Sequence, residues 1–534
     1  MIPAVEIGVF LLIFAVAIGL LSRRLGIAYP IGLMIGGLAV GFVPGLPEVR
    51  LESELVFAVF LPPILYTAAI ATPLRGFAFN LRPILLLAFG LVAFTTAAVA
   101  LALLWIVPGM PPAVAVLIGA LVSPPDAVAA TAVMQRLNLP PRIVTVLEGE
   151  SLVNDAAALV IYKFAIAAIL TGAFSWQAAT LEFAWIALAG TLLGAAIGWG
   201  SVWISRRVID SFAAAMVSLA VPFATYLAAE AVHASSVLAV VAGGLVRNWF
   251  VSEMSTAETR LRTFTTWEVV VFLVNSVVFV LIGLQLRPIL DGLADYPVLT
   301  LIGYAVVTAL VTIVVRPLWI FPMAHLPRWI VPGLAARDPA PPWQWLVVIS
   351  WAGLRGVVSL AGALAVPLVT AGGAPFPMRD LVLFLVYTTI FATLVLQGLA
   401  LPAIIRALGV SGDRAAAARA AEQALAQVKM SWAALAEIDT IAHGLKLPAR
   451  VVEPVRGAYA GPLEELGADD EAAATPERRA EEEARRRLHR AAVEARRRRL
   501  HKLHRDRLVG DETLRALERE LDLEELRHAG TADG

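Results

Sequence analysis

The chain has 534 residues, of which 59% are hydrophobic and only 16% are charged, and its formal net charge is zero. Soluble domains carry about 25% charged residues, so this composition is typical of a membrane protein, and the neutral balance argues against a nucleic-acid partner. The chain contains no cysteine, which excludes disulfides, thiolate metal sites and thiol catalysis.

Charge is distributed unevenly along the chain. Residues 411–534 hold 46 of the 84 charged residues. We therefore expect two domains, a transmembrane domain over residues 1–408 and a charged helical C-terminal domain over residues 409–534. Alanine, glutamate and arginine dominate the second domain, which favours helices exposed to water or paired with one another. Its arginine-dense stretch, residues 478–507, is of a kind that binds anionic membrane lipid.

The first domain reads as a series of membrane-spanning segments. A spanning helix needs roughly 20 mostly apolar residues. Thirteen such segments follow one another along the chain, and the third contains Pro62 and Pro63. They lie at about 3–22, 27–43, 53–72, 82–107, 112–135, 144–170, 177–204, 211–232, 235–247, 267–286, 297–321, 344–370 and 381–405. The sequence predicts an all-α membrane protein.

Arginines in the predicted loops indicate the orientation, because cytoplasmic loops are enriched in Lys and Arg. One side holds fourteen arginines and the other holds only three, Arg50, Arg287 and Arg379. The fourteen are Arg23, Arg24, Arg75, Arg82, Arg136, Arg142, Arg206, Arg207, Arg247, Arg260, Arg262, Arg316, Arg328 and Arg337. This bias places the C-terminal domain in the cytoplasm and the N-terminus outside, and it supports an odd number of spans.

The fifth segment contains "LVSPPDAVAATAV" at residues 121–133. Pro124 and Pro125 remove two backbone donors and predict a break in the helix near the middle of the membrane. Unwound backbone is tolerated there where it lines a cavity or is buried in protein. Asp126 follows at once, so a carboxylate lies beside the break. The simpler interpretation is a proline kink in which Asp126 caps the second half-helix.

The sixth segment contains "EGESLVNDA" at residues 148–156, again near mid-membrane. Ser151 and Asp155 are four residues apart and share one helix face, and Glu150 and Asn154 share a neighbouring face. Hard cations prefer oxygen ligands of this kind, and a carboxylate can hold a proton instead. A polar patch that satisfies neighbouring helices is the alternative.

The twelfth segment contains "SWAGLRGVVSLAG" at residues 350–362, with Arg355 among glycines. A buried arginine must be paired, and Glu150 is the partner we expect. Interrupted segments in corresponding positions of two halves indicate a transporter site. We therefore expect Asp126, Asp155 and Arg355 to converge.

These motifs resemble those of a known family. "GESLVNDA" after "SPPDAVAA", followed by "GLRGVVSLA", is similar to the first group of monovalent cation/proton antiporters, which includes bacterial and archaeal Na⁺/H⁺ antiporters and animal sodium/hydrogen exchangers. "LPPILY", "VFVLIGLQL" and "RPLWIFP" fit as well, and the resemblance covers about residues 5–408.

The resemblance implies thirteen helices in two inverted six-helix repeats, with two broken crossing helices, a dimer domain and a mobile ion-binding core. It implies that Asp155 binds the transported ion, that Asp126 and Ser151 help to form the alkali-cation site, and that Glu150 and Arg355 form a core ion pair. Asn154 stands where electrogenic relatives carry a second aspartate, which implies electroneutral exchange. Two residues depart from the family pattern, Thr67 in place of an acidic residue and Pro125 in place of threonine, and both bear on ion selectivity.

The expected function is therefore electroneutral Na⁺/H⁺ antiport, with K⁺ in place of Na⁺ as an alternative and Li⁺ as a further possible ion. A cation channel is the alternative from another class. A membrane enzyme using Ser151 and Glu150 is disfavoured because His233 and His325 lie at segment ends, away from these motifs. No cofactor is expected. The expected partners are membrane lipid and a second copy of the chain in a homodimer in the cell inner membrane.

Overall fold

The computed structural model describes residues 2–44, 56–134, 139–171, 176–208, 210–254, 257–293, 296–370 and 373–410, with further short stretches between 432 and 502. By its internal contacts the chain divides into two units, residues 1–415 and 416–534. In the second unit the described residues are mostly helical, and Arg456 forms an ion pair with Asp439 at 3.7 Å.

Each of the thirteen predicted segments coincides with helical residues in the first unit. Among the described residues, seven helices are long and apolar enough to span a membrane, and shorter apolar helices accompany them. The all-helical prediction is confirmed for this part of the chain. Its described residues include one isolated β-bridge, between Val369 and Pro375.

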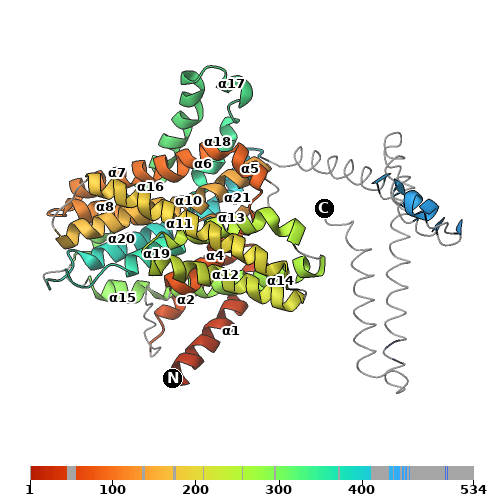
Figure 1. The fold of residues 1–534 in the computed structure, drawn as a ribbon. Coiled ribbons are helices and arrows are strands. Elements are labelled where there is room, and N and C mark those ends of the chain that lie inside the picture. The colour runs from red at the N-terminus through yellow and green to blue at the C-terminus, as the bar shows by residue number, and fades with distance from the viewer. Residues whose placement is uncertain are drawn as a thin grey trace. The chain divides into compact units, whose positions relative to one another are not determined.

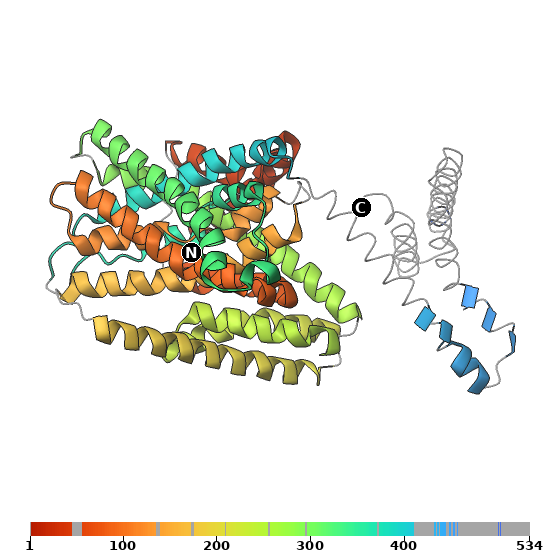
Figure 2. The ribbon, with the colours of Figure 1, turned by 90° about the horizontal axis from the view of Figure 1, so that it is seen from above.

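One group of helices, called here the scaffold bundle, packs together from both halves of the chain. It consists of α1 (Ile2–Leu25), α2 (Tyr29–Gly41), η1 (Val56–Phe60), α4 (Leu61–Ala71), α12 (Ser211–Ala231), α13 (Ser236–Met254) and α14 (Ala257–Leu284). Helix α11 (Trp176–Ser205) packs against α12 and α13 at the edge of this group (Figure 2).

The second group, called here the core bundle, is likewise assembled from both halves. It consists of α6 (Leu81–Leu85), η2 (Leu86–Leu91), α7 (Val92–Ile106), α8 (Pro112–Val122), α9 (Ala127–Met134), α10 (Pro141–Thr171), α16 (Val298–Ile330), α18 (Trp343–Trp351), α19 (Val357–Leu364), α20 (Arg379–Phe391), η3 (Ala392–Gln397) and α21 (Gly398–Ala407). Three short helices connect the larger ones, α5 (Leu74–Phe79), α15 (Leu286–Asp291) and α17 (Leu334–Arg337). The C-terminal end of α16 and the short helix α17 that follows it project together from the bundle as a hairpin (Figure 1).

Small residues let α11 and α13 approach closely. Side chains added at Gly194 and Gly198 would overlap the backbone of α13 at Ala239 and Gly243, and one added at Gly190 would overlap the backbone of Ser235, just before α13. Glycines spaced four residues apart form one smooth stripe on a helix, which is how helices pack in lipid without an apolar driving force between them. The contact fixes α11 to the scaffold bundle.

Two of the arginines that the sequence analysis assigned to loops are buried inside helices. Arg247 in α13 is 7% exposed and donates to the hydroxyls of Ser201 and Ser205, and Arg316 in α16 is 1% exposed. Helix α16 continues through Pro317, Pro322 and Pro327 to residue 330, beyond its predicted end. Twelve arginines against three remain, so the bias persists. The side that carries these arginines is called the arginine-rich side below.

Candidate functional site

The two predicted helix breaks are present, and they meet inside the core bundle. Helix α8 ends at Val122 and α9 begins at Ala127, while α18 ends at Trp351 and α19 begins at Val357. The backbone N–H of Asp126 donates to the carbonyl of Leu354 at 2.6 Å. Each break thus satisfies a backbone group that the other leaves without a helical partner.

Charged side chains compensate the ends of the half-helices. The guanidinium of Arg355, 1% exposed, donates to the carbonyl of Val122 at the last residue of α8, at 2.9 Å, and to the carbonyl of Gly353. The carboxylate of Asp126 packs against Gly356, at the first turn of α19. A cation is favourable at a helix C-terminus and an anion at a helix N-terminus, so both charges have a local stabilising partner.

Helix α10 presents two different faces, as the spacing of its polar residues predicts. Ser151 and Asp155 line a cavity together with Asp126. Glu150 and Asn154 are fully buried on the neighbouring face. The side-chain amide of Asn154 donates to the carbonyl of Pro125 at 3.1 Å, which holds α10 against the unwound backbone. Pro125 therefore contributes a carbonyl to this contact in place of a hydroxyl.

The predicted ion pair between Glu150 and Arg355 is wrong, because Arg316 takes this place. Arg316 Nη1 lies 2.6 Å from Glu150 Oε1, and Nη2 lies 2.7 Å from Oε2, so the pair is bidentate. Its Nε donates to the carbonyl of Ile349 at 3.0 Å. Both side chains are at most 1% exposed. A buried pair with this geometry satisfies both charges within the core bundle.

A cavity of about 990 Å³ lies between the scaffold bundle and the core bundle. Four carboxylates line it, Asp126 and Asp155 from the core bundle, Glu148 from α10 nearer its start, and Glu268 from α14. The lining extends to Leu20 in α1, Ala71 in α4 and Phe264 in α14, at the helix ends of the arginine-rich side. The cavity thus connects this side of the protein to the polar residues at the breaks.

Apolar side chains close the route toward the opposite side. Phe60, Val278, Leu281 and Ile282 of the scaffold bundle face residues of α19 around a void of about 10 Å³, and the residues of α19 are Val357, Leu360, Ala361 and Leu364. These residues are called here the outer seal. All of these side chains are apolar, so the void offers a water molecule none of the hydrogen-bond partners that it needs. In this structure the cavity reaches the carboxylates from the arginine-rich side.

The remaining polar residues of interest have clear locations. Thr67 lines the cavity, and its hydroxyl donates to the carbonyls of Pro63 and Ile64 in its own helix at 2.8 and 3.0 Å. Lys163 is exposed and lies outside the cavity lining. Among the described residues, no three His, Asp or Glu side chains gather as a resident metal would require. Two carboxylates and a hydroxyl suit a single alkali cation that enters and leaves.

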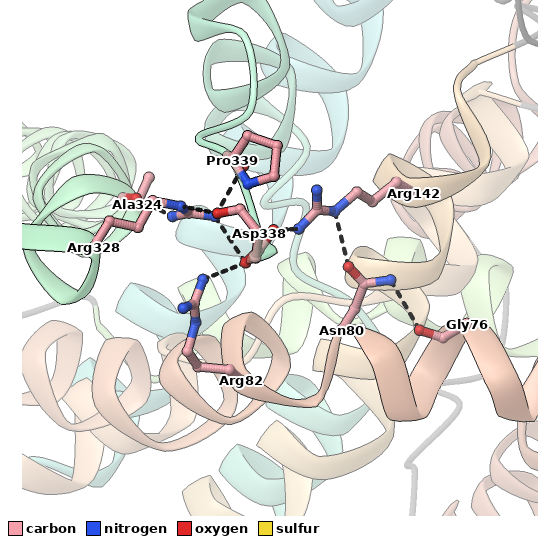
Figure 3. A network of polar contacts seen from close by, with 8 residues as sticks. All are labelled: Gly76, Asn80, Arg82, Arg142, Ala324, Arg328, Asp338 and Pro339. Atoms are coloured by element: carbon pink, nitrogen blue, oxygen red, sulfur yellow. Dashed lines mark hydrogen bonds and ion pairs between the residues drawn. The ribbon is translucent and has the colours of Figure 1, made fainter. Parts of the chain in front are cut away.

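An arginine cluster lies on the arginine-rich side of the core bundle (Figure 3). Asp338, after α17, accepts from Arg142 at 2.7 Å, from Arg82 at 2.5 Å and from Arg328 at 2.9 Å. Burial raises the pKa of the Asp338 carboxyl, but the hydrogen bond and charge of Arg142, with the charges of Arg328 and Arg82, hold this pKa below its usual value. The cluster joins α6, α10 and the hairpin that the end of α16 forms with α17.

The sequence analysis missed Arg316 and the cluster around Asp338. Arg316 precedes a proline, which resembles a helix end, and nothing in the spacing indicates which arginine reaches Glu150. Glu148 was noted only as part of the motif, and Glu268 was not noted. Both lie on helices that border the cavity, a relationship between distant segments that only the fold reveals.

A cavity that leads to a buried carboxylate, Asp155, beside two broken, crossing helices defines a secondary ion transporter. Residues 9–407 match the family model for the transmembrane sodium/hydrogen exchanger, so the chain belongs to the sodium/hydrogen exchanger family, whose members are cation/proton antiporters and not enzymes. The recognition made from the motifs is confirmed.

Several relatives place the chain within this family. It is 33% identical to an uncharacterised Na⁺/H⁺ exchanger of Mycobacterium tuberculosis over 98% of this chain and 96% of the relative. It is 35% identical to the sodium, potassium, lithium and rubidium/H⁺ antiporter of Bacillus subtilis over 74% of this chain and 60% of that protein. The solved sodium proton antiporter MjNhaP1 of Methanocaldococcus jannaschii has the same fold, with a TM-score of 0.60, 16% identity, and coverage of 76% of this chain and 99% of that one.

Proposed function

We propose that this antiporter exchanges one Na⁺ for one proton at Asp155, without net transfer of charge. The observation that carries the proposal is the position of Asp155, which lines the cavity together with Asp126 and Ser151 where the broken helices meet. A carboxylate in this position holds either a proton or a cation, because both neutralise the same charge. Competition for one group couples the two ions.

The charges that surround Asp155 support electroneutral exchange. Glu150 is balanced by Arg316 in a bidentate pair, and Asn154 is neutral. Asp126 lies at the first turn of α19, where an anion is stabilised. Asp155 is then the carboxylate whose charge is neutralised, either by one proton or by one cation. One proton therefore replaces one cation in each cycle.

Alternating access requires the core bundle to move past the scaffold bundle. A bare carboxylate is costly to carry past the apolar outer seal, whereas a carboxylate neutralised by Na⁺ or a proton is far less so. The core bundle therefore moves when Asp155 holds Na⁺ or a proton and does not move when Asp155 is a bare carboxylate. This restriction couples each movement of the core bundle to the transport of one ion.

We further propose the arrangement that the sequence favours. The protein has about thirteen spans in two inverted repeats, a transmembrane domain over residues 1–408 and a C-terminal domain over residues 409–534. It lies in the cell inner membrane as a homodimer, with the N-terminus outside and the C-terminal domain in the cytoplasm, where arginine-dense residues contact lipid. On this orientation the cavity faces the cytoplasm.

The test uses full-length protein in proteoliposomes that contain a pH-sensitive dye. Na⁺, Li⁺ or K⁺ is added in turn to liposomes that contain the wild type. Na⁺ and Li⁺ are each expected to drive protons out of the liposomes. Asp155→Asn should abolish exchange with every cation. Asp380→Asn, which removes a half-exposed carboxylate outside the cavity, should behave as the wild type. Exchange by Asp155→Asn above the rate of empty liposomes contradicts the assignment.

Three further comparisons separate the alternatives. A larger response to K⁺ than to Na⁺ identifies a K⁺/H⁺ antiporter. Na⁺ flux without proton movement identifies a channel. An imposed membrane potential should leave the wild-type rate unchanged, and a systematic dependence on potential shows that a second charge moves with each cycle.

A further inference from the structure

The cation site borders the scaffold bundle, and one polar side chain with which that bundle lines the cavity has no hydrogen-bond partner among the described residues. Asn275 lies in the middle of α14 and lines the same cavity as Asp126 and Asp155. It is 1% exposed. Both its side-chain oxygen and its side-chain nitrogen lack a hydrogen-bond partner in the described part of the chain.

A buried amide without partners is unfavourable, and native proteins rarely keep one without a reason. The Tyr29 hydroxyl lies close enough to interact with the amide. Neither amide atom forms a well-aligned hydrogen bond with a described residue, and the Tyr29 ring packs on Phe272 one turn before Asn275. Asn275 therefore lies in the lining of the cavity with both polar atoms buried and without a hydrogen-bond partner among the described residues. Such an arrangement suits a ligand that comes and goes.

The other polar side chains on the scaffold face of the cavity are less suitable. The Thr67 hydroxyl donates within its own helix, to Pro63 and Ile64. Glu268 is exposed, about two turns before Asn275 in α14 and toward the arginine-rich side. Asn275 is thus the buried group with an unused oxygen on this face, and amide oxygens are good ligands for hard cations.

We propose that Asn275 supplies an oxygen ligand, directly or through one water molecule, to the alkali cation held by Asp126 and Asp155, and so contributes to cation selectivity. The inference rests on the proposed function of Asp155. Since Asn275 belongs to the scaffold bundle, this ligand does not travel with the core bundle. The cation gains the contact when the site faces the cavity and loses it when the core bundle moves.

The test compares three variants of the full-length protein in proteoliposomes. Asn275→Leu keeps the size of the side chain and removes its oxygen, and Asn275→Asp keeps an oxygen. The matched control is Ser276→Ala, because Ser276 is also 1% exposed with an unpartnered side-chain oxygen but does not line the cavity. The apparent KM for Na⁺, Li⁺ and K⁺ and the maximal rate are measured at high pH, where protons compete least.

Asn275→Leu is expected to raise the KM for Na⁺ about tenfold, as the loss of one hydrogen-bond-strength contact to a charge predicts, and to change the ratio between Na⁺ and K⁺. Asn275→Asp should have a KM no higher than the wild type, and Ser276→Ala should be unchanged. An unchanged KM in Asn275→Leu overturns the inference. An equal rise in Asn275→Leu and Asn275→Asp shows that the oxygen is not the reason, and overturns it as well.

A binding measurement covers a variant that folds but transports poorly. Na⁺ that binds the folded protein raises the Tm of purified protein in detergent, and weaker binding reduces this rise. The rise should be smaller in Asn275→Leu than in Ser276→Ala, and equal rises overturn the inference. Asp155→Asn is measured alongside. If Asp155→Asn still exchanges ions, the proposed function fails, whereas if only the Asn275 variants match the wild type, this inference fails alone.

Discussion

The backbone N–H of Asp126 donates to the carbonyl of Leu354, so a direct main-chain bond of 2.6 Å joins the two interrupted helices at their breaks. The two half-helix pairs cannot shift independently without losing this bond. The position of the Asp126 carboxylate is accordingly set by the second break as much as by its own.

The first prediction concerns Gly356, where an added side chain would overlap the Asp126 carboxylate. Gly356→Ala must displace either Asp126 or the start of α19, and overpacking of this kind costs about 1–3 kcal/mol. We expect a folded protein with little or no exchange in proteoliposomes. Gly303→Ala in α16 is the control, because nothing lies within 4 Å of the added methyl group, and it should exchange normally. Equal rates in the two variants contradict the geometry described for the breaks.

The pair of Glu150 and Arg316 makes the second prediction. Removing one partner of a buried ion pair costs about 3–5 kcal/mol, since the other charge stays buried alone. Glu150→Gln and Arg316→Met should each lower the Tm in detergent, and the double variant should lose much less than the sum of the two. The same cycle with Arg355→Met should show weaker coupling to Glu150, because Arg355 donates to Val122 and Gly353. Stronger coupling of Glu150 to Arg355 refutes the pairing.

Gly194 in α11 makes the third prediction. A methyl group there would overlap the backbone of α13 at Ala239, whereas Gly200 in the same helix has open space. Gly194→Ala should lower the Tm because the helices must separate. Gly200→Ala should leave it unchanged or raise it slightly, since alanine is favoured over glycine in a helix by about 1 kcal/mol. Similar Tm values for both variants would show that α11 is not held by this contact.

Asp338 makes the fourth prediction, on pH. Its pKa is lowered in the folded protein, so its stabilising contribution is present above the unfolded value of about 3.9 and is lost only as the pH falls through the lower folded value. Asp338→Asn should therefore lower the Tm by a constant amount between pH 8 and pH 5. A Tm difference that disappears within this range shows that the carboxylate titrates there, and contradicts the lowered pKa.

The breaks were predictable from the sequence because they have local causes. Pro124 and Pro125 lack backbone donors, so no helix can run through them unbroken, and the glycines around Arg355 permit a similar interruption. The shared face of Ser151 and Asp155 follows from helix geometry alone. These features depend on neighbours in the chain, and the structure has them where the sequence placed them.

The partner of Glu150 was not predictable in the same way. Arg316 and Arg355 are both arginines in apolar segments, and the choice between them depends on how α16 packs against α10. Asn275 escaped notice because a neutral amide hardly changes the apolar character of its segment. Its importance depends on burial and on the missing partners of its two polar atoms, neither of which a sequence displays.

The outer seal also determines what the protein does when it is not exchanging ions. Protons can pass rapidly along an unbroken file of hydrogen-bonded water molecules, and the apolar side chains of the outer seal, among them Val278, Leu281 and Leu360, offer such a file no polar partners. A protonatable carboxylate can therefore remain in contact with water on one side of the membrane without becoming a leak. Protons then cross the membrane only in complete exchange cycles. A protein that has no cation to exchange does not dissipate the proton gradient.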